Sequence, residues 1–242
     1  MKQYEVKNTL TRNQFSVYYQ PKFGYMCGYP LAAEALIKLE NNTFITELDE
    51  YVLAEVAKQI AKWLAAGITP PPVSVNISHM DLTRTDMAEH IRDMVDFYHV
   101  PHNLIEFGIT ENAFSKDKDI LIYNLRKLQN YGFLISLNNF GGGYSSLSSL
   151  KELPIDILIL DPRLFSDSDS SQRAQKNVSY IITLAKNLGI CTIAEGIENI
   201  EQVAFLSALE CDLLQGSFFS RPLPVEEYEE TIRSIHDLRQ AL

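Results

Sequence analysis

Short runs of apolar residues alternate along the chain with longer segments whose apolar residues recur every three or four positions. The short runs predict strands, because period-two alternation and β-branched or aromatic residues are typical of half-buried sheet. These strands are expected at residues 15–19, 73–77, 105–110, 133–137, 157–160, 191–194 and 213–214. The longer segments have helical spacing, which predicts helices at residues 49–64, 85–99, 118–129, 177–188, 201–208 and 225–242.

The regular succession of strand and helix predicts the class of fold. No break in composition divides the chain, so we expect one α/β domain over residues 1–242 with a mostly parallel sheet. Seven or eight strand–helix units favour a (β/α)₈ barrel of the TIM type. A doubly wound sheet is the alternative, but no glycine-rich phosphate turn follows the first strand.

Composition narrows the classes of partner. The formal net charge is −10, and no basic stripe opposes it. Such a surface repels phosphate backbones and anionic membranes, so we expect neither direct nucleic-acid binding nor membrane binding. No apolar run is long enough to span a bilayer, and no signal-peptide core opens the chain. Three cysteines, Cys27, Cys191 and Cys211, lack metal-ligand spacing. They are expected to be buried thiols of a cytoplasmic protein.

Several polar side chains stand where predicted strands end. In a barrel these positions converge on one mouth, where the chemistry of such folds is carried. One asparagine or glutamate alone is usually a cap or a solvated residue, but an ordered set indicates a site for a charged ligand. The set is Glu34, Asn76, Asn138, Asn139, Glu195 and Gln215.

Ordered motifs around these positions resemble one known family. They are Gln20-Pro21-Lys22, Glu34-Ala35-Leu36, Asn76-Ile77-Ser78, Asn138 through Leu147, Ala194 through Glu198, and Gln215-Gly216 with Ser220-Arg221-Pro222. From about residue 12 to the C-terminus the chain resembles an EAL domain, the family that hydrolyses cyclic dimeric GMP. The resemblance implies a TIM-like barrel and a site built for two divalent cations that activate water.

The chain departs from the family where charge is needed. Neutral residues stand at Gly108, Asn138, Asn139 and Ile159, in place of a glutamate, two aspartates and the catalytic lysine. Each missing charge within 4 Å of a cation removes about 4 kcal/mol of attraction at an effective dielectric near 20. We therefore expect no metal, no cofactor and no catalytic residue. The vestigial site would comprise Glu34, Asn76, Gly108, Glu111, Asn138, Asn139, Ile159, Asp161, Glu195, Glu198 and Gln215.

Ligand binding without catalysis is a separate question. The family's basic residue after the EAL signature is Lys38 here, which cannot form the two-pronged phosphate contact of arginine. Pro162 replaces another expected arginine, and Arg163 is displaced by one position. The stretch between Lys38 and Asp49 is also much shorter than in the family. Possible contacts to cyclic dimeric GMP are Gln20, Glu34, Leu36, Lys38, Gln215 and Pro222.

These residues lead to a hypothesis of function without catalysis. The chain resembles degenerate EAL-only adaptors that bind the transcription activator of flagellar genes, which implies a protein partner and regulation of motility. One alternative is a receptor that binds cyclic dimeric GMP without hydrolysing it. A remote alternative is residual metal-dependent phosphodiesterase activity.

Overall fold

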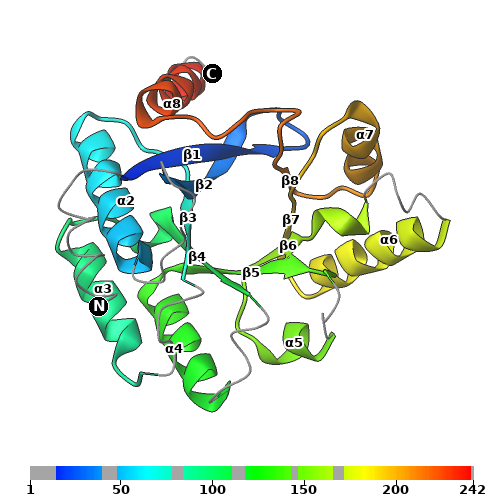
Figure 1. The fold of residues 1–242 in the computed structure, drawn as a ribbon, viewed down its shortest axis with the longest axis horizontal. Coiled ribbons are helices and arrows are strands. Elements are labelled where there is room, and N and C mark those ends of the chain that lie inside the picture. Colours follow the sequence, from blue (N-terminus) through cyan, green and yellow to red (C-terminus); the bar gives the residue numbers. More distant parts are fainter. Residues whose placement is uncertain are drawn as a thin grey trace.

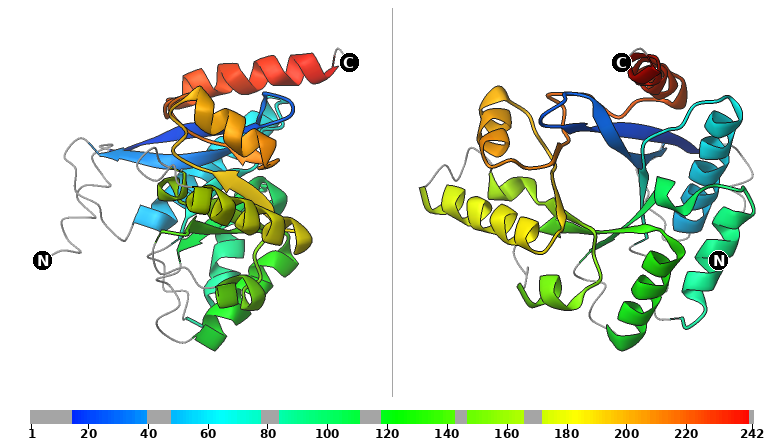
Figure 2. Two further views of the ribbon diagram at one scale, coloured as in Figure 1. Left: turned by 90° about the vertical axis from the view of Figure 1, so that its right-hand side faces the viewer. Right: turned by 180° about the vertical axis from the view of Figure 1, so that it is seen from behind.

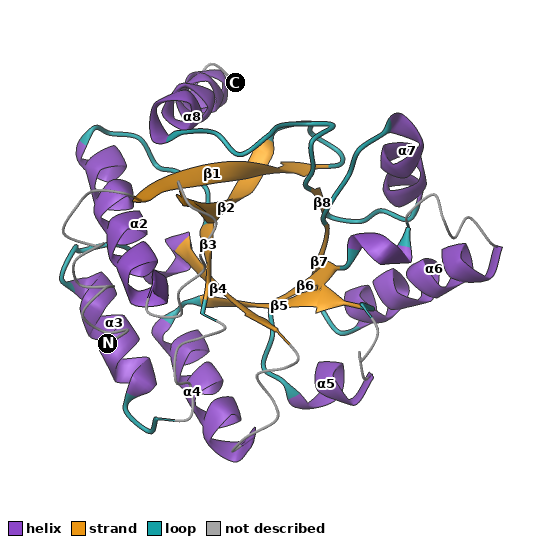
Figure 3. Cartoon of the chain, viewed as in Figure 1, coloured by secondary structure: helices purple, strands orange, loops and turns teal. Residues whose placement is uncertain are grey.

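Eight strands form a closed barrel with helices around its outside (Figure 1). The computed structural model describes residues 15–39, 48–77, 84–110, 118–142, 147–165 and 172–240. The strands are β1 Phe15–Gly24, β2 Pro30–Leu39, β3 Val73–Asn76, β4 Ile105–Thr110, β5 Leu134–Phe140, β6 Ile157–Leu160, β7 Cys191–Ala194 and β8 Leu213–Leu214. This closed ring confirms the predicted (β/α)₈ barrel and excludes the doubly wound sheet (Figure 3).

The helices follow the predicted pattern with shifted ends. They are α2 Leu48–Ala65, α3 Met87–Asp96, α4 Lys118–Tyr131, α5 Leu147–Glu152, α6 Gln172–Asn187, α7 Ile200–Ala208 and α8 Val225–Gln240. Helix α3 is shorter than the predicted segment 85–99, and α6 starts five residues before the predicted 177. The short α5 has no counterpart among the predicted helices. Among the described residues, none of these helices is long and apolar enough to cross a bilayer.

The hairpin of β1 and β2 is the main departure from the predicted elements. No strand was expected at residues 30–39, where three alanines and three leucines accompany a single β-branched residue. These residues nevertheless pair antiparallel with β1, from Phe15 opposite Leu39 to Phe23 opposite Pro30. Tertiary pairing therefore overrides weak local propensity here. Strand β1 is antiparallel to β8 as well, whereas all pairs from β2 to β8 are parallel.

Apolar side chains fill two separate layers. The larger core lies between the strands and the outer helices and includes the fully buried Trp63, Tyr19 and Tyr228. Tyr19 stacks on Tyr228 at 5.1 Å between ring centroids, and Trp63 contacts both rings. This cluster packs α8 across β1, as Figures 1 and 2 show. The smaller cluster consists of Ala32, Ile157, Ile159, Ile193 and Leu213.

A buried ion pair lies within the strand layer. Lys22 of β1 and Glu106 of β4 are both fully buried, and their charged groups are 3.3 Å apart. The Lys22 ammonium also donates to Ser74 Oγ of β3. Isolated charges are too costly to bury, so this pair persists only because each ion compensates the other.

Candidate functional site

A chain of hydrogen bonds joins polar residues at the mouth of the barrel. Glu34 is its centre, because Asn76 Nδ2 donates to Oε1 at 3.1 Å and Gln215 Nε2 donates to Oε2 at 2.8 Å. Gln215 also donates to Gln20 Oε1 at 3.1 Å, and Gln20 in turn donates to the Ser220 carbonyl. The barrel thus brings together four predicted residues from β1, β2 and the ends of β3 and β8.

Asn138 extends this chain from the other side of the mouth. Its Nδ2 donates to Asn76 Oδ1 at 2.7 Å. In the sheet, β4 lies between β3 and β5, and Gly108 is the β4 residue opposite Asn76. A Cβ atom placed on Gly108 would lie 2.6 Å from both Asn138 Nδ2 and Asn76 Oδ1. The absent side chain of Gly108 therefore leaves the space through which the two asparagines bond.

Glu195, directly after β7, is the second carboxyl group of the mouth. It is half-buried. Burial, and then the negative charge of Glu34, raise its pKa to about 8. The buried Lys22 opposes this shift without cancelling it. At pH 7 the Glu195 carboxyl is therefore mostly protonated, so it contributes little negative charge to the mouth.

Asp161 is held in a local ion pair. Arg163 Nη2 donates to Asp161 Oδ2 at 2.8 Å, and Arg163 Nε donates to Oδ1 at 2.8 Å. The backbone amide of Arg163 also donates to Oδ1, at 2.9 Å. These contacts lower the pKa of Asp161, with the side-chain hydrogen bond from Arg163 the largest cause. Both oxygens of this carboxylate are therefore occupied by the arginine that the sequence places one position late.

Ile159 packs among apolar side chains. It is 2% exposed and belongs to the smaller apolar cluster. Among the described residues, the fully buried cation of the barrel is Lys22, on strand β1. Its ammonium is engaged by Glu106 and Ser74.

The other predicted residues lie outside the hydrogen-bonded chain. Asn139 is exposed and adopts a left-handed backbone with φ of 57°, which asparagine tolerates better than most residues. Glu198 and Pro222 are exposed, and Leu36 is half-buried on β2. Lys38 is placed by its backbone pairing with Ser16, but its side chain is outside the described set. Glu111 lies outside the described residues altogether.

The carboxylate and amide oxygens described at the mouth are poor ligands for a pair of divalent cations. Such ions need several oxygen ligands, with charge supplied by carboxylates. Here Glu34 and Asn76 already accept amide hydrogens, and Asp161 is paired with Arg163. Among the described residues, no group of three or more His, Cys, Asp or Glu side chains could hold a metal ion.

Two features of the site were missed from the sequence. One is the Lys22–Glu106 pair with Ser74. The sequence indicated it only in that Lys22 lies two positions after Gln20, so that both side chains point to the same face of one strand. The other is the ion pair between Arg163 and Asp161. From the sequence, Arg163 was considered only as a ligand-contacting arginine displaced by one position. The partners of Lys22 lie on β3 and β4, whereas the partner of Arg163 lies two positions away in the same turn.

Comparison with known proteins identifies the family. A model of the EAL domain matches residues 3–222. The chain belongs to the EAL domain family. Cyclic di-GMP phosphodiesterase NbdA of Pseudomonas aeruginosa is 31% identical over 95% of this chain, and signaling protein YkoW of Bacillus subtilis is 31% identical over 94%. This EAL chain spans 32% and 30% of those two relatives, or about a third of their length.

Solved EAL structures agree with the barrel. The PaMucR phosphodiesterase in complex with c-di-GMP superposes with a TM-score of 0.83 at 28% identity, covering 93% of this chain and 98% of that one. The EAL domain of Mycobacterium smegmatis DcpA gives 0.82 at 28% identity, covering 91% of this chain and 98% of that one. The EAL assignment and the closed barrel therefore rest on both sequence and structure.

Proposed function

We propose that this EAL domain does not hydrolyse cyclic dimeric GMP and acts instead by binding a protein. The observation that carries the proposal is the hydrogen bond between Asn76 and Asn138 across Gly108. The family resemblance places a metal-binding carboxylate at position 108. Here that space holds an amide pair, which brings hydrogen bonds but no charge.

The state of the remaining acids supports the same proposal. Glu34 accepts two amide hydrogens, and the raised pKa of Glu195 keeps that carboxyl mostly protonated at neutral pH. A dication entering the mouth would have to displace amide donors and expel a proton. Hydration of the free ion competes with such a site, so metal occupancy at cellular concentration would be low.

The lysine position gives independent support. Ile159 packs among apolar side chains, and Lys22 is held by Glu106. Neither residue can orient or stabilise an attacking water at the mouth. The proposal therefore needs no metal and assigns no catalytic residue.

Net charge and family resemblance together indicate the class of partner. A chain with a net charge of −10 is complementary to a basic protein surface. The resemblance to EAL-only adaptors points to a transcription regulator of motility genes, with this domain as its anti-activator in the cytoplasm.

A second candidate function is a receptor for cyclic dimeric GMP that binds without hydrolysis. It is favoured by the intact chain from Gln20 through Gln215 to Glu34, three of the ligand contacts that the family resemblance implies. The curated relative NbdA is named as a cyclic di-GMP phosphodiesterase, and the PaMucR structure is a c-di-GMP complex. Binding of that nucleotide by this chain is a matter for direct measurement.

One pair of assays separates these functions. Purified protein is incubated with cyclic dimeric GMP in Mg²⁺ or Mn²⁺, hydrolysis is followed by chromatography, and binding is followed by calorimetry. We expect no linear product. Saturable heat without product would favour the receptor, and no heat at high micromolar ligand would favour the protein-binding role.

The control is a variant with family charges restored, Gly108→Glu, Asn138→Asp, Asn139→Asp and Ile159→Lys together. Turnover by the unmodified protein that disappears in Glu34→Ala and Glu195→Ala would contradict the proposal. The protein-binding role is then tested by capture from the source cells, and failure to recover a stoichiometric partner would count against it.

A further inference from the structure

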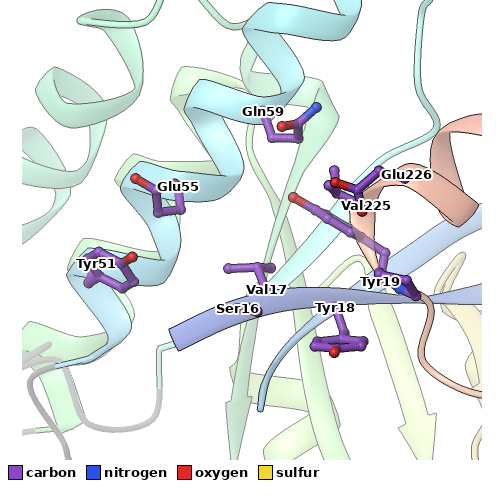
Figure 4. Close-up of a pocket in the computed structure, with 10 residues that line it drawn as sticks. Ser16, Val17, Tyr18, Tyr19, Tyr51, Glu55, Gln59, Val225 and Glu226 are labelled. Carbon is purple, nitrogen blue, oxygen red and sulfur yellow. The ribbon is translucent and has the colours of Figure 1, made fainter. Parts of the chain in front are cut away.

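A pocket lies outside the barrel, between α2 and α8 and over β1 (Figure 4). Its volume is about 270 Å³. Sites for small molecules are usually larger, about 300–1,000 Å³, so this space suits a single large side chain better than a dinucleotide. It is also separate from the mouth, because Val17 lies on the side of β1 that faces α2, whereas Gln20 faces the barrel interior.

The lining combines an apolar floor with a polar rim. Val17 and Tyr19 rise from β1, and Val225 closes the α8 side. Tyr51, Glu55 and Gln59 follow one another at four-residue intervals, so they share one face of α2. Figure 4 shows the hydroxyl end of Tyr19 reaching toward the gap between the two helices.

The walls of this pocket are acidic. Glu55 lies on α2, and Glu226 lies in the first turn of α8. Glu55 pairs with Lys58 at 3.2 Å, across an exposed surface where such pairs are weak. Within the described part of the chain, no cation pairs with Glu226. One of the two carboxylates is thus fully available to a guest, and the other is held only by a surface lysine.

The floor of the pocket is rigid. Tyr19 is 1% exposed, stacks on Tyr228, and contacts the edge of Trp63. Trp63 Nε1 donates to Glu229 of α8, which fixes the helix against α2. Burial and the nearby Glu55 raise the pKa of Tyr19, so its hydroxyl stays a neutral donor at physiological pH. A preformed pocket loses little entropy when it is filled.

We propose that the α2–α8 pocket binds an arginine side chain presented by a basic protein partner. Its aliphatic stem would lie on Val17 and Val225, while the guanidinium would face the polar rim that contains Tyr51, Glu55 and Glu226. A planar guanidinium suits this combination better than an ammonium, because it stacks on aromatic rings and offers several fixed donors. The inference rests on the proposed protein-binding function and names the chemistry of the partner.

The test is a titration of the full chain with three capped tripeptides, acetyl-Gly-X-Gly-amide, where X is arginine, lysine or norleucine. Binding is followed by NMR through the methyl signals of Val17 and Val225, which report on the pocket itself. We expect the arginine peptide to saturate these shifts with a dissociation constant of about 1 mM or lower. The lysine peptide should bind about threefold more weakly, and norleucine more weakly still.

Two variants and one matched control assign the binding to this charge pattern. Glu226→Gln should weaken the arginine peptide about threefold to tenfold. Gln59→Glu adds a carboxylate to the wall and should strengthen binding, a gain that misfolding cannot mimic. Glu201→Gln is the control, because Glu201 occupies the first turn of α7 with the same charge but lies away from the pocket.

Three results would overturn the inference: preference for norleucine, equal loss in Glu226→Gln and Glu201→Gln, or filling of the pocket by self-association without peptide. Because the readout is peptide binding, it is independent of the hydrolysis assay. Hydrolysis of cyclic dimeric GMP would contradict the proposed function while leaving the pocket result interpretable. Absence of arginine-peptide binding would likewise overturn the pocket inference, while leaving the non-catalytic assignment untouched.

Discussion

Gly108 shows how one missing side chain reorganises its surroundings. Asn76 and Asn138 stand on strands separated by β4, yet they bond at 2.7 Å because Gly108 leaves the space between them open. Glu34 in turn accepts a hydrogen bond from the side-chain Nδ2 of Asn76. The mouth is thus a neutral amide network around one carboxylate, which explains why we propose binding rather than hydrolysis.

The first prediction at this scale concerns Gly108→Ala. The new Cβ would lie 2.6 Å from Asn138 Nδ2 and from Asn76 Oδ1, so the hydrogen bond must break or shift. We expect the free energy of unfolding to fall by about 1–3 kcal/mol, measured by urea denaturation. In an Asn138→Ala background the amide is already gone, so the same substitution should cost less. An equal cost in both backgrounds would show that the contact is not the cause.

The second residue-scale prediction follows from the raised pKa of Glu195. Its folded value is about 8 and its ordinary value is 4.5, so the folded state holds a proton that the unfolded state releases between these values. Stability from this group is therefore fully present below pH 4.5, falls as pH rises toward 8, and is constant above 8. The difference in unfolding free energy between the wild type and Glu195→Gln should decline steadily over this window, by at most about 5 kcal/mol. A difference that rises or stays flat with pH would contradict the shift.

Among the elements, β1 has the most unusual role. It is antiparallel to both neighbours, carries Gln20 to the mouth and Lys22 into the layer beneath it, and presents Val17 and Tyr19 to the outer helices. Its partner β2 was missed because its alanines have little strand propensity. The strand forms because pairing with β1 buries Ala33 and Ala35 and brings Glu34 opposite Gln20.

The prediction at the scale of elements concerns the ion pair between β1 and β4. Lys22→Met leaves the Glu106 carboxylate buried without its partner, so we expect a loss of about 3–5 kcal/mol in unfolding free energy. Replacing both residues, as Lys22→Met with Glu106→Leu, removes both charges and should recover most of that loss.

Chemical denaturation of these two variants is compared with Lys58→Met, which breaks an exposed pair and should cost less than about 1 kcal/mol. A double variant no more stable than Lys22→Met alone would mean that the loss comes from packing rather than from an unpaired charge.

At the scale of the whole molecule, barrel closure gathers distant positions into two separate surfaces. Gln20 and Gln215 lie 195 positions apart in the chain and are hydrogen-bonded at the mouth. On the outside, α8 returns from the end of the chain to cover β1 and forms the acidic pocket with α2. Mouth and pocket can therefore be tested independently, one by nucleotide and one by peptide.

The sequence by itself determined the barrel, the family and most of the succession of elements, apart from β2 and α5. Local periodicity predicts the elements, because each amphipathic segment must bury its apolar face whatever its neighbours are. The family rests instead on the resemblance of the ordered motifs. The sequence also singled out six polar residues for the mouth, and four of them, Glu34, Asn76, Asn138 and Gln215, join one hydrogen-bonded chain.

Tertiary structure alone decided how those residues are used. The side-chain oxygen of Asn76 accepts a hydrogen bond from Asn138 because Gly108, between them, has no side chain. This arrangement arises only when β3, β4 and β5 pair. The strand at residues 30–39, the burial of Lys22 with Glu106, and the α2–α8 pocket likewise depend on contacts between distant segments. Such contacts leave no local period in the sequence, because their energies come from pairing and burial rather than from neighbouring residues.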